Sequence, residues 1–298
     1  MDKVKPIRLS GGMRVSELVD EMKGVGFGAG KIARASEIMA SMFKDKDCKV
    51  FLGVAGAMVP AGMKQVIVDL LSEVDVFVTT GANLTHDFVE DLGYSHYHVK
   101  PPFDDAKLNK AGLDRMYNVA MPNTVYEGME DFFDKNWSEF QKCKTIKEFL
   151  WKMGELSPGK GILKTCYERK IPIFCPALAD SGIGLMIWGR KVAGKEISID
   201  AFEDMKEIID IAWTSKKNGV IYIGGGTPKN FIQQSMQFSK GADYGIQITT
   251  DRPEPGGSSG APMEEGISWG KLKPKANFVD VSCDATIALP LIYASIKK

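Results

Sequence analysis

The segment between residues 251 and 276 contains the side chains with the clearest chemical potential. Its sequence, DRPEPGGSSGAPMEEGISWGKLKPKA, is rich in glycine, proline and serine, and long irregular segments of this kind are usually functional or disordered. Near its end Trp269 and Lys271 flank a glycine, and Glu264 and Glu265 precede them. A lysine becomes a nucleophile when desolvation lowers its pKa, because the free amine is the reactive form. A neighbouring indole would help to exclude water, although most lysines in such a chain are solvated surface residues.

Four glycine-containing loops follow predicted strands and could hold an anionic ligand. Ligands of open α/β sheets bind outside the carboxyl ends of the strands. Glycines let the backbone approach a ligand closely, and helix N-termini favour phosphates. No GxGxxG fingerprint follows the first strand, and any single loop could be a simple tight turn. The four loops are GVAGAMVPAG (53–62), TTGANLTHD (79–87), PALADSGIG (176–184) and GGGTPKN (224–230).

The chain has three histidines, His86, His96 and His98. His86 follows the TTGAN loop and could contact a ligand or serve a structural role. His96 and His98 lie two residues apart, but further metal ligands at a recognisable spacing are missing, so no metal site is expected. No GxSxG motif and no Cys–His arrangement with a third member occurs, and hydrolase chemistry therefore finds no support.

Strands alternate with helices along most of the chain, and this pattern predicts the frame that positions the loops. The expected strands are almost continuously apolar, as in parallel sheets covered on both faces. We therefore expect an α/β fold, doubly wound and Rossmann-like, with a mostly parallel sheet and helices on both faces. The expected strands are 49–54, 75–80, 171–177, 219–225, 244–250 and 276–282. The expected helices are one or two within 16–43, then 61–73, 85–92, 200–217, one that Pro228 opens at its first position, one starting near Asp284, and a helical middle from about 104 to 170 that includes LDRMYNVA.

Composition narrows the class of protein. Of the 298 residues, 44% are hydrophobic and 26% are charged, which is ordinary for a globular enzyme. Thirty-eight basic residues balance 38 acidic ones, so no global field favours nucleic acid or a membrane surface as a partner. No apolar run is long enough for a membrane span, and the first residues do not resemble a signal peptide. Five scattered cysteines suggest reduced thiols and a cytoplasmic location. We expect a single domain over residues 1–298, with an irregular N-terminal arm of about residues 1–15.

The chain resembles the deoxyhypusine synthase family over roughly residues 30–298. The most specific stretch is EEGISWGK (264–271), which looks like the family's active-site SWGK segment. Supporting stretches, in the same order along the chain, are FLGVAGAMVPAG, VTTGAN, IPIFCPALADSGIG, GADYGIQI and VDVSCDATIALPLIYA. The resemblance implies an NAD-binding domain that assembles as a homo-oligomer, a tetramer, with active sites between paired subunits.

The resemblance also implies a reaction, the transfer of an alkyl group. NAD would take a hydride from the carbon beside the secondary amine of spermidine. The resulting imine would pass to Lys271 while 1,3-diaminopropane leaves. The four-carbon unit would then move to a lysine of the translation initiation factor five-A precursor, where reduction fixes it as deoxyhypusine.

The family's site residues can be carried onto matching positions of this sequence. Lys271 would be catalytic, Glu265 would hold the substrate ammonium, and Trp269 would line the aliphatic stem and face a cation. The other expected substrate contacts are His86, Asn230 and Ser258. The expected NAD contacts are Gly56, Ala57, Met58, Pro60, Thr80, Gly81, Asp180, Thr250, Asp251, Asp284 and Ala285.

Five positions depart from the family's pattern. Thr85 and His86 replace two glutamates of the TAGGxEED loop, which reads TGANLTHD here. Leu185 and Ser258 replace polyamine-binding aspartates, and Asn230 stands where a histidine is common. Each lost polar contact would cost about 1–3 kcal/mol if nothing compensated for it. The amine donor and the acceptor therefore stay open.

Two alternatives remain beside deoxyhypusine synthesis. The first is a homospermidine synthase-like transfer to a free diamine such as putrescine, which would use the same lysine. The second is a catalytically silent NAD-binding or scaffold protein, in which Lys271 would be solvated or misaligned.

Overall fold

The computed structural model describes residues 3–297, so the parts of the domain and arm predictions that concern Met1, Asp2 and Lys298 lie outside the described residues. The chain forms two compact units. The first, called the sheet unit, comprises residues 3–55, 73–78 and 205–297, and the second, called the helical unit, comprises residues 56–72 and 79–204. The single domain expected from the sequence stays a prediction.

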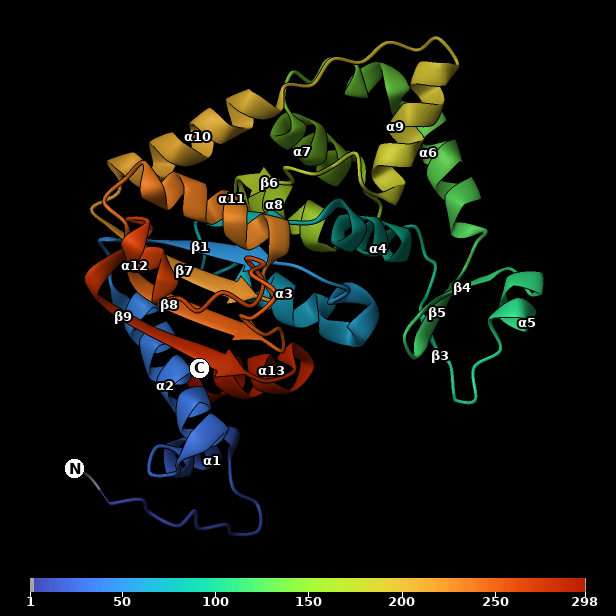
Figure 1. Ribbon diagram of the computed structural model, residues 1–298. Coiled ribbons are helices and arrows are strands. Elements are labelled where there is room, and N and C mark those ends of the chain that lie inside the picture. The colour runs from blue at the N-terminus through green and yellow to red at the C-terminus, as the bar shows by residue number, and fades with distance from the viewer. Residues whose placement is uncertain (1–2, 298) are drawn as a thin grey trace. The chain divides into compact units, whose positions relative to one another are not determined.

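The main sheet has the strand order β6-β2-β1-β7-β8-β9 (Figure 1). Within the sheet unit the neighbouring pairs β1–β7, β7–β8 and β8–β9 are all parallel. One row of partners runs from Phe51 through Val220 and Gly245 to Phe278. The strands are β1 (Cys48–Val54), β2 (Val76–Thr79), β6 (Ile173–Phe174), β7 (Lys217–Ile223), β8 (Ala242–Thr249) and β9 (Leu272–Ser282). The expected α/β class with a mostly parallel sheet is confirmed.

The apolar strands predicted from the sequence form the core of the sheet unit. Phe51, Leu52, Ile221 and Tyr222 of β1 and β7 are at most 1% exposed. Each such side chain contributes about 1.5–3 kcal/mol through its removal from water. Strands buried on both faces are the reason that β1 and β7 read as continuous apolar runs.

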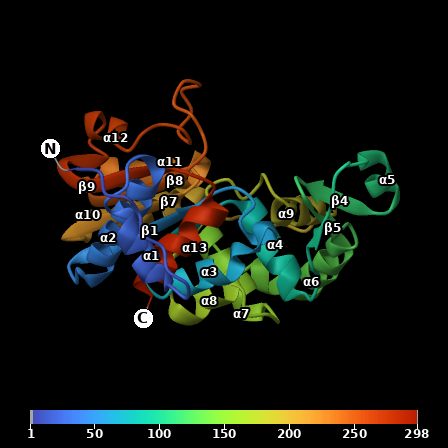
Figure 2. The same ribbon diagram turned by 90° about the horizontal axis from the view of Figure 1, so that it is seen from below.

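Helices cover both faces of this sheet (Figures 1 and 2). On one face α2 packs against β1, β8, β9 and α13, and on the other α11 packs against β1 and β7. Buried Ile32, Ala35, Met39 and Met42 form the apolar stripe of α2 at helical spacing. The helices of the sheet unit are α1 (Val15–Met22), α2 (Phe27–Lys44), most of α10 (Ala201–Thr214), α11 (Gly226–Gln237), α12 (Glu265–Ser268) and α13 (Ala285–Ile296).

The helical unit has its own core of packed aromatic rings. Phe133, Phe140 and Phe149 are fully buried, and their ring centroids lie 5.0–6.2 Å apart. The helices of this unit are the short π-helical turn η1 (Val59–Met63), α3 (Lys64–Leu70), α4 (Gly81–Asp91), α5 (Asp105–Lys110), α6 (Val125–Phe140), α7 (Ile146–Leu156), α8 (Ile162–Arg169) and α9 (Gly182–Val192).

The prediction of a helix over LDRMYNVA (113–120) is wrong. This stretch forms β4 (Leu113–Met116) and β5 (Val119–Pro122), an antiparallel pair that β3 (Tyr97–His98) extends to a three-stranded sheet. Met116 pairs with Val119, so the two strands are joined by a two-residue turn in which Tyr117 has a φ of 53°. The spacing of Leu113, Met116 and Ala120 imitates a helix, but hairpin pairing prevails over that periodicity.

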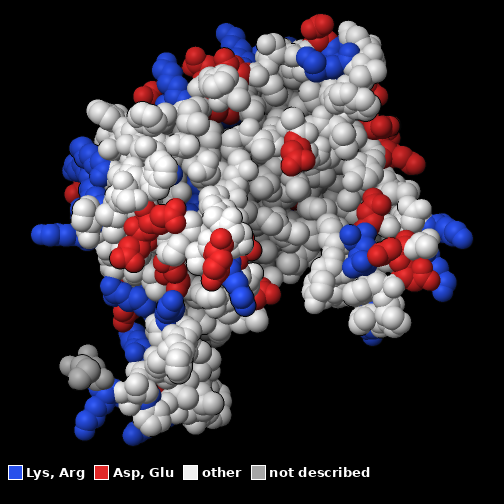
Figure 3. All heavy atoms as spheres, viewed as in Figure 1, with Lys and Arg blue, Asp and Glu red and all other residues white. Residues whose placement is uncertain are grey.

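For the third predicted strand and the helix predicted over 61–73, the structure differs from the prediction in where the element begins or ends. The third predicted strand is reduced to the two residues of β6, and the helix predicted over 61–73 begins with η1, inside which Gly62 has a φ of 85°. Within residues 3–297 no helix combines the length and hydropathy needed to cross a bilayer. Both signs of charge are scattered over the face drawn in Figure 3.

Candidate active site

A helix-ending turn fixes the backbone of Lys271. Helix α12 ends at Ser268, Trp269 is its C-cap, and Gly270 follows with a left-handed φ of 71°. The N–H of Gly270 donates to the carbonyl of Ile267 at 3.0 Å, and the N–H of Lys271 donates to that of Gly266 at 2.8 Å. These two bonds are the pattern of a Schellman motif, in which glycine takes the left-handed position without steric cost. The turn therefore sets where the lysine side chain starts.

Lys271, Trp269 and Glu265 lie together on and after α12. The Nζ of Lys271 lies 4.9 Å from the centroid of the Trp269 ring, within cation–π range. Trp269 is 56% exposed, and Glu265 is exposed while Lys271 is half-buried. Glu265 is the first residue of α12, so this short helix and the turn after it carry a carboxylate, an aromatic face and an amine; their roles as site residues stay a prediction.

Four predicted cofactor contacts gather at the carboxyl edge of the sheet. Bonds from Gly224 N–H to Ile248 and from Cys283 N–H to Thr249 continue the strand ladder at this edge. Thr250 and Asp251 follow β8 there. Asp284 and Ala285 open α13 at the same edge, as Figure 1 shows, and the Asp284 carboxylate accepts the N–H of Thr286 at 2.7 Å.

The structure does not bring Lys271 next to that edge. Its carbonyl accepts the N–H of Ala242 at 3.1 Å, which places its backbone at the amino ends of β8 and β9. Strand β8 has eight residues, and the seven steps from its first to its last residue, at about 3.3 Å each, put roughly 23 Å between the backbones of Lys271 and Asp284. A lysine side chain is much shorter than that.

The remaining predicted cofactor contacts belong to the helical unit. Gly56 has a left-handed φ of 73° and is exposed, as is Ala57, while Met58 is half-buried and Pro60 lies within η1. Buried Asn83 ties this loop to the start of α4. Its Oδ1 accepts the N–H of Val59 at 3.2 Å, and its own N–H donates to the side chain of Thr80 at 3.2 Å.

A third loop joins these two in the helical unit. A Cβ on Gly81 would lie 2.5 Å from the hydroxyl of Ser181, so only glycine fits there. Thr85 donates to the carbonyl of Gly81 and accepts the N–H of Ile183 at 3.2 Å. Exposed Asp180 stands just before α9. The sequence predicted these loops at one edge, and here they are hydrogen-bonded to each other.

His86 is buried and forms part of a chain of three side chains. Its Nδ1 lies 3.0 Å from Nε2 of His96, whose Nδ1 lies 2.8 Å from a carboxylate oxygen of Glu90. Burial, and then repulsion from His96, lowers the pKa of His86 to about 4. His86 is therefore a neutral hydrogen-bonding group at pH 7.

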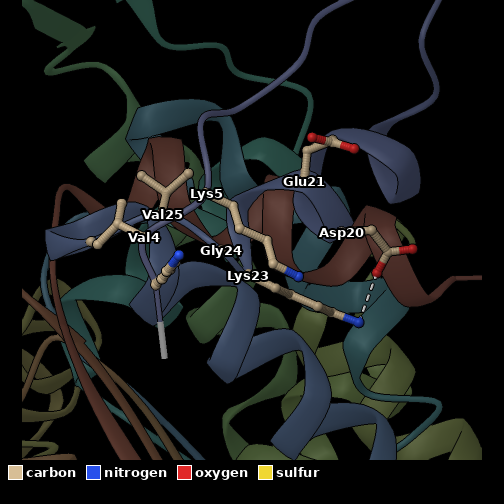
Figure 4. Close-up of a pocket in the computed structure, with 9 residues that line it drawn as sticks. Val4, Lys5, Asp20, Glu21, Lys23, Gly24 and Val25 are labelled. Carbon is tan, nitrogen blue, oxygen red and sulfur yellow. Dashed lines mark ion pairs between the residues drawn. The ribbon is translucent and has the colours of Figure 1, made fainter. Parts of the chain in front are cut away.

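The hollow shown in Figure 4 is a feature of the N-terminal part of the sheet unit. It is formed by the arm residues Lys3–Lys5 and by residues of α1 and the turn after it. The N–H of Lys5 donates to Gly24 at 2.8 Å, and Lys23 pairs with Asp20 at 2.9 Å. No predicted site residue lines it. Among residues 3–297 no three His, Cys, Asp or Glu side chains gather as a metal site would need.

Comparison with known proteins decides the family. The sequence profile described as deoxyhypusine synthase matches residues 17–296. The chain belongs to the deoxyhypusine synthase family. A relative from Methanosarcina mazei, "Probable deoxyhypusine synthase 1", is 42% identical over 99% of this chain and 94% of its own length. A relative of the same description from Archaeoglobus fulgidus is 42% identical over 95% of this chain and 94% of its own length.

The fold agrees with that of a solved structure. A crystal structure from Entamoeba histolytica, described as a candidate deoxyhypusine synthase, superposes with a TM-score of 0.69 at 21% identity, over 95% of this chain and 93% of that one. Membership in the deoxyhypusine synthase family makes this chain an enzyme, a transferase of deoxyhypusine synthesis.

For this deoxyhypusine synthase family member, sequence reasoning missed two buried polar residues near the predicted site, Asn83 and Lys229. Lys229 follows Pro228 and precedes Phe231 and Ile232, all of which are buried in α11. A lysine within the apolar face of a predicted helix is the signal that could have revealed it.

Proposed function

We propose that this enzyme transfers the aminobutyl group of spermidine, in an NAD-dependent reaction, through an imine on Lys271 to a lysine of the translation initiation factor five-A precursor. The observation that carries the proposal is the Lys271 amine, which starts from a fixed turn and lies 4.9 Å from the Trp269 ring. Both residues belong to the SWGK segment (268–271), on which the family resemblance depends.

The chemistry requires a primary amine that can exchange with another amine at an imine carbon. Oxidised spermidine presents that carbon, and the Lys271 nitrogen would attack it while the carbon–nitrogen bond to 1,3-diaminopropane breaks. The acceptor lysine would then attack the Lys271 imine and release Lys271 as a free amine. A lysine amine suits both exchanges because the bond that it forms is reversible.

Glu265 and Trp269 supply complementary contacts for a polyamine. An exposed carboxylate forms charge-assisted hydrogen bonds with an ammonium group. The exposed face of Trp269 attracts a cation and packs on a methylene chain. Together they would orient the four-carbon part of spermidine beside Lys271.

The residues present fit an NAD molecule. In the sheet unit the backbone is left-handed at Gly224, where φ is 73°, and such a position allows close approach of a pyrophosphate. The carboxylate of Asp284 suits ribose hydroxyls. When bound, NAD would supply the hydride acceptor at the start of the reaction and the donor at its end.

The proposal includes a homo-oligomer, a tetramer, in the cytoplasm. The backbones of Lys271 and Asp284 are roughly 23 Å apart. This separation supports an active site that combines Lys271 of one subunit with the cofactor-binding residues of another. Free cysteines, four of them buried, suit a reducing compartment.

A transfer assay tests the proposal. Purified protein is incubated with NAD and spermidine labelled in its aminobutyl part, with either the factor precursor or putrescine as acceptor. We expect label in the precursor, and we expect Lys271→Ala to lower transfer at least about 10³-fold. The exposed residue Lys275 provides a matched control, since Lys275→Ala should transfer at the wild-type rate.

The alternatives predict other outcomes. Label only in homospermidine would replace the protein acceptor with a free diamine. Leu185, which is 53% exposed, bears on that result because the resemblance places a polyamine-binding aspartate at its position. No transfer to either acceptor, with NAD still bound, would mean a scaffold protein.

A further inference from the structure

Lys229 is a buried lysine to which the proposed reaction gives no role. It lies in the first turn of α11 and is 1% exposed. Its Nζ donates to the carbonyl oxygens of Ser258 at 2.7 Å and Ala261 at 2.6 Å. Removing an ammonium group from water costs several kcal/mol, so a residue placed in this way requires an explanation.

Helix stability does not explain the position of Lys229. The first turn is the positive end of the helix dipole, where a cation is unfavourable. Burial lowers the pKa of Lys229 to about 8, the charge of Lys271 adds to that effect, and Asp280 and Glu265 oppose it. The positive charge of Lys229 is thus disfavoured at this position. The pair of hydrogen bonds to carbonyl groups is the feature left to explain why a lysine is buried here.

Both carbonyls belong to one segment, residues 258–263, that is fastened at further points. The hydroxyl of Ser259 accepts the N–H of Gly226 at 2.8 Å, and its carbonyl accepts the amide of Gln247 at 3.0 Å. The N–H of Met263 donates to the Asp280 carboxylate at 3.1 Å. A Cβ on Gly225 would lie 2.3 Å from the Ser259 backbone, so the segment lies directly on the start of α11.

The segment leads into the candidate active site. Helix α12 begins at Glu265, and a Cβ on its Gly266 would lie 3.9 Å from the amide of Gln233 in α11. Figure 1 shows α11 and α12 on the same face of the sheet. Any shift of segment 258–263 would therefore displace the start of the turn that carries Lys271.

We propose that Lys229 is a positioning residue, which holds segment 258–263 through two carbonyl groups and thereby sets Glu265, Trp269 and Lys271 for amine transfer. The proposal rests on the proposed function. A single amine satisfies two carbonyls three residues apart, as no apolar side chain can. The amine still has hydrogen-bond donors after it loses a proton. This contact of Lys229 with the carbonyls of Ser258 and Ala261, called the clamp, therefore does not depend on the charge.

The test compares Lys229→Met with Lys217→Met, both in the NAD-bound protein. Lys217 is a suitable control because its Nζ also donates a short hydrogen bond, to Asp45 at 2.7 Å, but it lies at the start of β7, away from segment 258–263. In Lys229→Met we expect kcat of transfer and the rate of borohydride-trapped adduct on Lys271 to fall about 10-fold to 100-fold, because small misplacements cost rates of this size. The KM for NAD should change less than about twofold.

Hydrogen–deuterium exchange adds a readout that does not depend on activity. Amides of residues 256–264 should exchange at least about tenfold faster in Lys229→Met, while amides of α13 keep the wild-type rate. If Lys229→Met does not fold, Ser259→Ala removes a neighbouring fastening and should change kcat and exchange in the same direction by about threefold or more.

The outcomes separate the clamp from the proposed function. Wild-type rates in Lys229→Met, or faster exchange with unchanged kcat, would overturn the positioning role. If the wild-type protein transfers no aminobutyl group, the proposed function fails, and the exchange comparison alone decides whether Lys229 fastens the segment.

Discussion

His86 Nδ1 lies 3.0 Å from His96 Nε2, and this contact links a residue of the TGANLTHD loop to the carboxylate of Glu90. The family resemblance places a glutamate at the position of His86. A glutamate would be an anion, whereas the buried imidazole with its lowered pKa is neutral. A neutral imidazole that is oriented through a second imidazole therefore stands where the resemblance leads one to expect a charged group.

We expect His86 to destabilise the folded state as the pH falls. Its pKa is lowered from 6.5 to about 4 in the folded protein, so between these values the unfolded chain binds more protons. Stability from this group is thus complete above pH 6.5, declines as the pH falls, and is lost by about pH 4. The loss is on the order of 1–3 kcal/mol.

Urea unfolding at pH 7 and at pH 4.5 measures the effect. His86→Gln should show a smaller pH-dependent loss than the wild type, because its side chain does not titrate. Exposed His98 is the control, and His98→Gln should keep the wild-type pH dependence. The titratable groups that face His86 are His96 and Glu90. Equal pH dependence of stability in all three proteins would contradict the assignment of the acid-induced loss to His86.

Gly270→Ala tests the turn before Lys271. The φ of 71° at Gly270 is left-handed, and nothing lies within 4 Å of an added Cβ. The cost is therefore purely conformational, about 1–2 kcal/mol of unfolding free energy. We expect a loss of this size in thermal unfolding, together with slower adduct formation on Lys271.

Gly257→Ala is the matched control for that substitution. It lies in the same long segment, has open space around an added Cβ, and does not have a left-handed φ. If Gly257→Ala and Gly270→Ala had equal effects on stability and adduct formation, the Schellman turn would have no special role.

Asp87→Ala should destabilise the helical unit strongly. Fully buried Asp87 accepts the N–H groups of Ile162 and Leu163 at 2.9 and 3.0 Å, and Lys64 lies 3.2 Å away. Removing the carboxylate leaves the first turn of α8 and a partly buried cation without this partner, which costs about 3 kcal/mol or more. Urea unfolding of Asp87→Ala beside Asp131→Ala, an exposed aspartate, would measure the difference. A loss below about 1 kcal/mol would mean that Asp87 behaves as a surface charge.

Mixing two inactive variants tests the proposed homo-oligomeric site. If each site takes Lys271 from one subunit and Asp180 from another, re-association of Lys271→Ala with Asp180→Ala creates some sites with both residues intact. About a quarter of the wild-type activity should then return. Failure to regain activity, with mixed oligomers demonstrated by mass, would place both residues in the same chain's site.

Apolar periodicity predicted the frame of the fold because buried parallel strands leave a clear signal. The prediction over 49–54 corresponds to β1, and that over 244–250 corresponds to β8. Residues 113–120 were misassigned because hairpin pairing depends on partners outside the local pattern. Lys229 was missed for a related reason, since its two carbonyl partners lie about 30 residues away in the sequence.

The most direct test of the central claim is to trap the imine. The protein is incubated with NAD and labelled spermidine in the absence of an acceptor, reduced with borohydride, digested and analysed by mass spectrometry. We predict one aminobutyl group on the peptide that contains Lys271, and none when NAD is omitted. Label on a different lysine, Lys229 included, or an unlabelled protein with NAD and spermidine both bound, would contradict the proposal.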